Sequence, residues 1–445
     1  MTQNNPALDA RRGMAGSADA AQKNQLLDAT FNKVAWRLLP FLFVCYFFAY
    51  LDRVNVGFAK LQMLSDLSFS DAVYGLGAGV FFIGYFLFEV PSNMILHRVG
   101  ARRWIARIMI SWGIISTSMM FVQSPTSFYI LRFLLGVAEA GFFPGIILYL
   151  TYWFPSQRRG RITALFMVAI PVSGIIGGPV SGWILDNFNG QMGMAGWQWL
   201  FLIEGLPTVL IGASVMYFLT DRIADARWLT VAEKKLIGDA IAADAKTQEA
   251  HSFADALKDK RVWTLSLIYF CIQMGVYAIS FWLPTLIKLS GFQSDTVVGL
   301  VSAVPYIAAA ITMIIIGRSA DMRRERRWHL IVPVMMAVVG LMGSAYFPLG
   351  SVLALASLTL ATMGVFTALP MFWPLPSAFL GGTAAAGGLA MINSFGNLAG
   401  FVSPYLVGAI KEATNSTNLA LYILSGVAFF GALLILTVPA RSVNR

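Results

Sequence analysis

The strongest constraint on the fold of this chain is a series of twelve apolar stretches, each about twenty residues long or longer. A helix of that length rises about 1.5 Å per residue and crosses the hydrocarbon core of a bilayer, which is about 30 Å thick. Only 12% of the 445 residues are charged, against about 25% in a soluble domain. We therefore predict an all-α polytopic membrane protein. The predicted spans lie near residues 34–58, 73–96, 104–123, 126–153, 162–185, 197–219, 262–286, 295–317, 328–347, 350–373, 385–410 and 418–439.

The spans fall into two sets of six, separated by one long polar segment. We predict an N-terminal half over 34–220, a cytoplasmic linker with a short amphipathic helix over 221–261, and a C-terminal half over 262–439. Residues 1–33 lack an apolar core, so we expect a disordered cytoplasmic tail there and not a signal peptide. Residues 440–445 form a second short tail.

Basic residues indicate the orientation of the chain. Most of the 32 Lys and Arg residues fall on the side that holds both termini and the linker, which predicts that this side is cytoplasmic. The exceptions are Lys60, Lys288 and Lys411, expected in loops on the opposite side, and Arg53 and Arg132, which fall within spans. Since the bases are spread over short loops, the formal charge of +10 reflects topology and does not indicate a nucleic acid partner.

The two halves look like copies of each other. A basic loop follows span two at 97–104, and a similar basic loop follows span eight at 321–328, about half a chain length later. A duplicated six-plus-six arrangement is typical of transporters, in which one half rocks against the other around a site near the bilayer midplane.

The loop after span two carries the residues of a known motif. Segment 93–103 resembles the loop signature of the major facilitator superfamily, with Asn93 and His97 in place of its first Gly and its Asp, while the second copy at 317–321 restores both. The resemblance implies a conformational, gating role for the matching residues Arg98, Gly100, Arg102, Arg103 and Asp321.

Four further segments resemble the anion:cation symporter family within that superfamily. They are residues 51–55, 89–93, 132–145 and 393–397, and the likeness extends from about Lys33 to Pro439. The resemblance implies proton-linked import of a small organic anion, such as tartrate, a phthalate-like acid, a hydroxyphenylacetate-like acid or a sugar acid. It also implies a monomer in the bacterial inner membrane that uses the proton as coupling ion and needs no cofactor.

Ionisable residues inside the spans are the best candidates for function. Such a group costs at least about 2.5–3.5 kcal/mol to insert, so it is a functional hypothesis by default. The C-terminal half has no Asp, Glu, Lys or Arg away from a loop, and we expect the ionic chemistry in the N-terminal half. The charged residues there are Asp52, Arg53, Glu89, Arg132, Glu139 and Glu204.

Two arginines are the expected anion ligands. Arg53 lies about five to seven residues from the outer end of span one, at a depth similar to that of Arg132, and two arginines at one level can clamp a carboxylate. The alternative for both is an outer gate or a structural contact between helices. Arg132 and Glu139 are seven residues apart, about 10 Å along one helical face, which is too far for a simple ion pair.

Asp52 and Glu139 are the expected proton carriers. Asp52 points about 100° away from Arg53, so we expect it to face a neighbouring span, near span four, while Arg53 faces the cavity. The alternative for both acids is a permanently protonated or paired structural role. Glu89 is expected to bond backbone groups freed by Pro91 and to act in conformational change, and Glu204 is expected to be structural.

Aromatic and amide side chains complete the predicted site. We expect substrate contacts from Tyr50, Tyr85, Trp373 and Asn393, with simple packing as the alternative. The apolar stretch around Ile170 in span five favours a weakly hydroxylated or aromatic acid over a polyol acid.

Other classes of function fit less well. Two cysteines within apolar runs and three histidines offer no disulfide framework or metal cluster, and we find no nucleophile–base constellation of an enzyme. A channel lacks a ring of charges or a selectivity loop. The remaining alternative is a proton-coupled antiporter or exporter of the same superfamily, which we expect to prefer cations or lipophiles, unlike a site with buried arginines.

Overall fold

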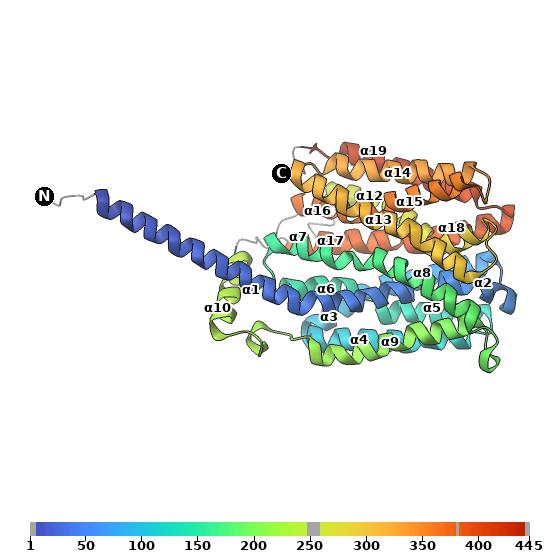
Figure 1. Cartoon of the computed structure of the whole chain (residues 1–445), viewed down its shortest axis with the longest axis horizontal. Coiled ribbons are helices and arrows are strands. Elements are labelled where there is room, and N and C mark those ends of the chain that lie inside the picture. Colours follow the sequence, from blue (N-terminus) through green and yellow to red (C-terminus); the bar gives the residue numbers. More distant parts are fainter. Residues whose placement is uncertain (1–5, 247–258, 380–381, 441–445) are drawn as a thin grey trace.

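The computed structural model describes residues 6–246, 259–379 and 382–440, and all regular secondary structure in these ranges is helical. Eleven of the described helical segments are long and apolar enough to cross a membrane. They run side by side in two bundles, with α1 to α9 in one and α12 to α19 in the other (Figure 1). The all-helical fold predicted from the apolar stretches is confirmed.

The first half contains the predicted spans one to six. Ser70 accepts a hydrogen bond that caps α3, and Ser124 forms a capping box before Pro125 in the first turn of α5, so both helices begin where their sequences predict. Gly141, with φ of +85°, separates α5 from α6 inside span four. The helices are α1 (Pro6–Val54), α2 (Val56–Leu67), α3 (Asp71–Val99), α4 (Ala101–Ser118), α5 (Pro125–Glu139), α6 (Phe142–Thr151), α7 (Ser156–Met167), α8 (Ala169–Asn187) and α9 (Gly196–Phe218).

The second half contains the predicted spans seven to twelve, after linker helix α10 (Val231–Lys246). The stretch expected as one span over 385–410 is divided at Leu398 into α17 and α18, and it is the predicted span that is not among the eleven. The helices are α12 (Lys260–Lys288), α13 (Asp295–Arg323), α14 (Arg327–Tyr346), α15 (Val352–Phe372), α16 (Pro374–Phe379), α17 (Gly382–Asn397), α18 (Ala399–Thr414) and α19 (Asn418–Thr437).

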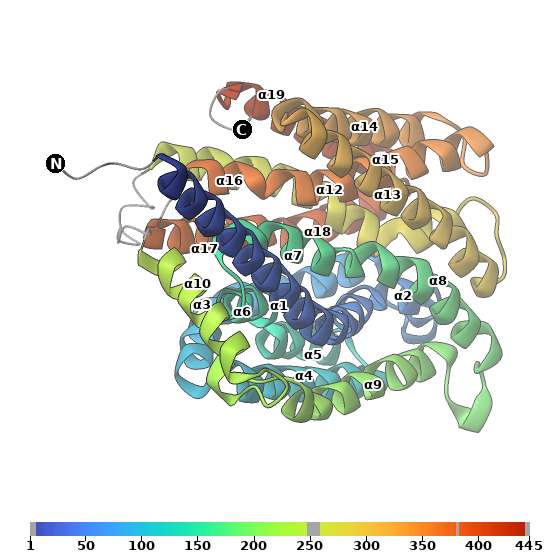
Figure 2. The same ribbon diagram turned by 60° about the vertical axis from the view of Figure 1, so that its left-hand side comes forward.

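The N-terminal segment differs from the prediction. Helix α1 already begins at Pro6, so the expected disordered tail is wrong for residues 6–33, and α1 extends beyond the bundle (Figures 1 and 2). Ala is the best helix former, and seven of the 28 residues from 6 to 33 are Ala. The predicted end of span one near 58 is also wrong, because α2 continues the span to Leu67 and places Lys60, expected in a loop, in a buried helix.

The start of α1, helix α10 and the end of α19 lie at the same end of the bundle, which we call the linker end; the opposite end is the far end (Figure 1). The halves meet along two related helix pairs, α3 with α18 and α8 with α13. A methyl group at Gly75 would lie 2.6 Å from the carbonyl oxygen of Pro404, and one at Gly178 would lie 2.9 Å from that of Gly299. Small residues thus permit close backbone contact between the halves.

Polar contacts between the halves are concentrated at the far end, as far as the described residues show. Asp71 of α3 pairs with Lys411 of α18 at 2.8 Å, and the backbone N–H of Ala72 donates to Glu412 at 2.8 Å. Asp186, at the end of α8, accepts from the Ser294 hydroxyl at 2.6 Å, just before α13. The structure is therefore held closed at the far end.

Candidate functional site

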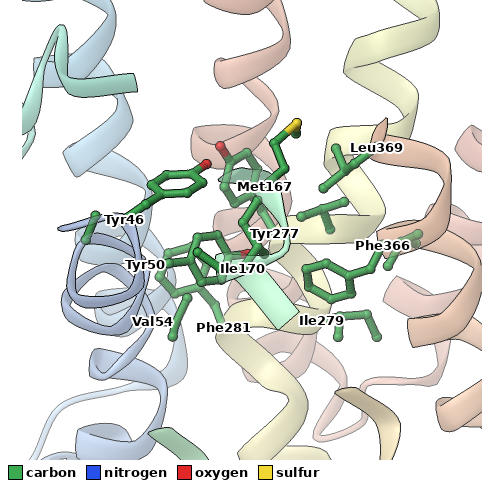
Figure 3. Packing of buried hydrophobic residues seen from close by; sticks show 14 of the residues in the cluster. Tyr46, Tyr50, Val54, Met167, Ile170, Tyr277, Ile279, Phe281, Phe366 and Leu369 are labelled. Atoms are coloured by element: carbon green, nitrogen blue, oxygen red, sulfur yellow. The ribbon is translucent and has the colours of Figure 1, made fainter. Parts of the chain in front are cut away.

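A small cavity of about 40 Å³ lies between the two halves. It has room for a few water molecules, so an organic ligand would require the lining side chains to move apart. Figure 3 shows that Tyr46 and Tyr50 of α1 converge with Met167, Ile170, Tyr277 and Leu369 from other helices. The lining consists of Tyr46, Tyr50, Arg53, Tyr85, Phe143, Met167, Ile170, Tyr269, Gln273, Val276, Tyr277, Leu369, Asn393 and Asn397.

Among the described residues of this lining, Arg53 is the charged one. Its guanidinium carbon lies 5.6 Å from the ring centroids of both Phe81 and Tyr85, within the range of a cation–π interaction. Its Nη2 atom donates to Oε1 of Glu139, which is completely buried in α5 and does not line the cavity. The Arg53 side chain therefore both lines the cavity and contacts a buried acid.

The Arg53–Glu139 pair corrects the depths assigned from the sequence. Arg53 lies fourteen residues before the end of α2 at Leu67, and Glu139 lies fourteen residues after the start of α5 at Pro125. At about 1.5 Å per residue, both are about 21 Å from the far end. The prediction erred because it ended span one near 58, which placed Arg53 level with Arg132.

Arg132 does not line the cavity. Its Nε and Nη2 atoms donate to the carbonyl oxygens of Gly77 and Ala78 in α3, each at 3.2 Å, and its guanidinium carbon lies 5.0 Å from the Phe81 ring. The arrangement corresponds to the alternative in which Arg132 joins neighbouring helices. The structure thus does not bring the two arginines together at the cavity.

Asp52 is buried away from the cavity, as its position next to Arg53 predicts. Its carboxylate accepts hydrogen bonds from Thr208 of α9 at 2.7 Å and from Ser116 of α4 at 3.2 Å. It therefore faces predicted spans three and six, whereas the sequence analysis placed it near span four. Glu204, for which no partner was predicted, accepts from Ser181 of α8 at 2.6 Å.

Glu89 connects the two halves. Its carboxylate accepts from the Asn393 amide at 2.7 Å and from the Ser394 hydroxyl at 2.9 Å, both in α17. The expected bonds to backbone near Pro91 are replaced by this contact, which lies nearer the linker end of α3. Asn393 also lines the cavity, so a ligand that contacts Asn393 there would disturb its hydrogen bond to Glu89.

The predicted aromatic contacts divide into two groups. Tyr50 and Tyr85 line the cavity, and the Tyr50 hydroxyl lies 2.8 Å from that of Ser280 in α12. Trp373 lies one layer behind the lining, with its ring centroid 5.0 Å from that of Tyr269.

The sequence analysis missed several lining residues of the second half. The hydroxyl of Tyr277 donates to Asn397 at 2.9 Å, and Gln273 donates to that hydroxyl at 3.4 Å. Gln273 and Tyr277 lie one turn apart in α12, and this pair of neutral polar residues within an apolar run was the available signal. The prediction took its neutral candidates of the second half from spans ten and eleven, which left span seven out.

The predicted gating residues lie at the linker end. Gly100 has φ of +97°, a conformation that favours glycine, and places the backbone N–H of Arg102 2.7 Å from the Asp221 carboxylate. Arg98 and Arg103 are exposed. In the second copy of the loop, Asp321 pairs with Arg326 at 2.6 Å. Arg102 of the first copy thus contacts an acid outside its loop, whereas the acid and the base of the second copy belong to the same loop.

Comparisons with known proteins agree on one family. The sequence model of the Major Facilitator Superfamily matches residues 42–404. The chain is 49% identical to the "Putative metabolite transport protein NicT" of Pseudomonas putida, with 94% of this chain and 96% of that protein covered. It is 48% identical to a "Putative tartrate transporter" of Agrobacterium vitis (95% and 94% covered) and 43% identical to the "Quinolone resistance transporter" of Acinetobacter baumannii (92% and 94% covered). The fold matches the xylose transporter XylE from E. coli with a TM-score of 0.74 at 13% identity, covering 91% of this chain and 99% of XylE.

Proposed function

Because this chain belongs to the major facilitator superfamily, we propose that it imports a small organic anion together with protons by alternating access between its two halves. Membership makes it a multi-pass membrane transporter and not an enzyme, and its bacterial relatives are consistent with the inner membrane. The observation that carries the proposal is the Arg53–Glu139 ion pair beside the cavity between the halves.

In the proposed mechanism, the substrate and the proton compete for the two members of this pair. A substrate carboxylate that enters the cavity accepts two parallel hydrogen bonds from Arg53 and displaces Glu139. Glu139 then lies in an apolar environment without its cation, and such a carboxylate gains a proton readily. Substrate binding and proton uptake are therefore linked through one arginine.

The rest of the cavity sets the expected substrate chemistry. Tyr85 provides a flat surface beside Arg53, and Met167 and Ile170 provide an apolar wall. The polar groups of the opposite wall, Gln273 and Asn397, are neutral and suit a second, weaker contact. We propose a mono- or dicarboxylate with a flat or weakly hydroxylated body.

The names of two relatives support different functions. The tartrate transporter of Agrobacterium vitis supports an organic acid as substrate, whereas the quinolone resistance transporter of Acinetobacter baumannii supports the alternative, a proton-coupled exporter. The buried arginine at the cavity favours an anion in either case. The remaining proposals are that Asp52 carries a proton as well, that the protein acts as a monomer, and that its termini are cytoplasmic.

Transport into proteoliposomes tests the proposal. A panel of radiolabelled anions, comprising tartrate, phthalate, benzoate and a sugar acid, is offered under an imposed pH gradient that is acidic outside. We expect accumulation of at least one anion, which a protonophore abolishes. Accumulation of no anion, combined with proton-driven movement of a quinolone in the opposite direction to the proton, would establish the exporter instead.

A further inference from the structure

A second group of buried acids lies next to the candidate site, and one of them, Glu204, has no role in the proposals above. Helices α1 and α9 run antiparallel, and Asp52 of α1 contacts Thr208 of α9. Glu204 lies one turn before Thr208 on α9, and Asn55 lies three residues beyond Asp52, at the junction of α1 and α2. This register brings Asp52, Asn55 and Glu204 onto one shared face of the two helices.

The polar groups of this face are incompletely satisfied. Asp52, Asn55 and Glu204 are each at most 2% exposed. Ser181 donates to Oε1 of Glu204, but Oε2 of Glu204 and both side-chain polar atoms of Asn55 make no well-formed hydrogen bond among the described residues, although the Asn55 side chain lies close enough to act on the Glu204 carboxylate. Buried polar atoms are rarely left in this way unless water or a mobile proton serves them.

A second, smaller cavity adjoins these groups. It measures about 10 Å³, close to the least space that one water molecule needs, and its lining includes Asn55, Ser181, Ser280 and Tyr306. Ser280 also contacts Tyr50, whose side chain lines the larger cavity beside Arg53. The Tyr50–Ser280 hydrogen bond therefore joins the two cavities.

We propose that Glu204 is a further proton-binding residue, connected to the substrate cavity through one water molecule and the hydroxyls of Ser181, Ser280 and Tyr50. This inference adds a further proton-binding residue to the proposed function. Its effect on transport rests on the proposed function, whereas proton binding by Glu204 does not. In the step itself, the Ser181 hydroxyl gives its proton to Oε1 of the ionised Glu204 carboxylate and takes one from the water molecule. The water is reprotonated through the hydroxyls of Ser280 and Tyr50, each of which accepts one proton and donates another, and the reverse sequence returns the proton.

The surroundings of Glu204 suit this role. Asp52 of α1 acts electrostatically on Glu204 across the packed helices, and two interacting carboxylates cannot both ionise easily. Helices α4 and α8 face the two acids with the hydroxyls of Ser116 and Ser181. Asp66 of α2 bonds to Trp197, two turns of α9 away from Glu204 and outside the cavity.

Infrared difference spectroscopy tests proton binding without any substrate. In the reconstituted protein, a pH change should produce a carbonyl band of a protonated carboxyl group that disappears in Glu204→Gln. Ser181→Ala keeps the acid but removes its donor, so the band should persist at a shifted frequency; this second variant also serves if Glu204→Gln does not fold. Asp66→Asn is the matched control and should leave the band unchanged. A band that is the same in the wild type, in Glu204→Gln and in Ser181→Ala would overturn the inference.

Transport then separates this inference from the proposed function. With wild-type protein that couples anion uptake to protons, Glu204→Gln should lower the ratio of protons to substrate by one, and Tyr50→Phe should slow proton movement. An unchanged ratio, together with an unchanged infrared band, refutes the role of Glu204 and leaves the proposed function intact. If wild type shows no proton-driven anion uptake but the band depends on Glu204, the proposed function fails while Glu204 remains a proton-binding residue.

Discussion

The competition between substrate and Glu139 for Arg53 predicts that two substitutions in one ion pair have opposite effects on binding. Glu139→Gln replaces a charged partner of Arg53 by a neutral one that still accepts a hydrogen bond. Arg53 keeps its charge in this variant, so what is lost is the attraction between two close opposite charges, which is about 1.5 kcal/mol or more. The substrate then displaces a partner weaker by at least about 1.5 kcal/mol, so its affinity at neutral pH should rise at least about 10-fold.

Arg53→Ala should act in the other direction. Removing one partner of a buried charge pair costs about 2–5 kcal/mol of binding energy, so affinity should fall at least about 30-fold. The same change leaves Glu139 buried without a cation, which should cost about 3–5 kcal/mol of folding free energy. Adding Glu139→Gln to Arg53→Ala should recover stability but not binding.

Equilibrium binding of the transported anion in detergent, at neutral pH, measures all three variants, and thermal unfolding measures their stability. Asp66→Asn, an acid outside the site, is the matched control. Gradient-driven accumulation should be lost in Glu139→Gln while counterflow, which needs no net proton movement, persists. Weaker binding by Glu139→Gln would refute competition for Arg53, because it would mean that Glu139 supports the substrate.

Four further outcomes are expected. Arg132→Ala should lower the thermal stability, because Arg132 joins α5 to the backbone of α3. Substrate affinity in the folded fraction should stay within about threefold of the wild-type value. A much larger loss of affinity would show that Arg132 belongs to the substrate site. Glu89→Ala should increase the fraction of molecules open at the linker end, measured by electron paramagnetic resonance distances between labels on the two halves, because the bonds to Asn393 and Ser394 are lost; an unchanged distance distribution argues against a gating role. In competition assays, the amide of a substrate acid should bind about 2–5 kcal/mol more weakly than the acid, and equal inhibition by both would reject Arg53 as the anion ligand. The N–H of Thr230 and the ammonium of Lys33 hold the pKa of Glu233 below its ordinary value of 4.5. The contact between α10 and α1 should therefore persist at neutral pH and weaken as the pH falls below 4.5. Hydrogen exchange in α10 that does not rise on acidification would contradict this.

Much of the fold could be predicted from the sequence because bilayer thickness sets the length of each span. The ends of the spans were less predictable. Asn55 and Lys60 look like the start of a loop, but the helix continues through α2 and buries Lys60 3.3 Å from the Trp282 ring centroid, paired with Asp71. Asp71 and the Trp282 ring compensate the buried charge of Lys60. Both lie on other helices, so the local sequence does not reveal them.

The candidate site shows the same division. The angle between Asp52 and Arg53 was predictable because adjacent helical residues point about 100° apart. The pairing of Arg53 with Glu139 depends on the relative depth of two helices, and an error of nine residues at the end of one helix changes the predicted partner. Contacts across the halves, such as that of Glu89 with Asn393, depend on tertiary packing alone.

The separation of charge between the halves has a consequence for alternating access. Arg53 and Glu139, the ion pair beside the cavity, both belong to the N-terminal half, and Gln273 and Asn397 of the C-terminal half, which face it, are neutral. Moving a buried charge away from its partner leaves both uncompensated, whereas separating a neutral pair such as Tyr50 and Ser280 costs one ordinary hydrogen bond. One half can therefore rock against the other near the midplane without breaking the Arg53–Glu139 pair, which leaves that pair to be broken by substrate and proton.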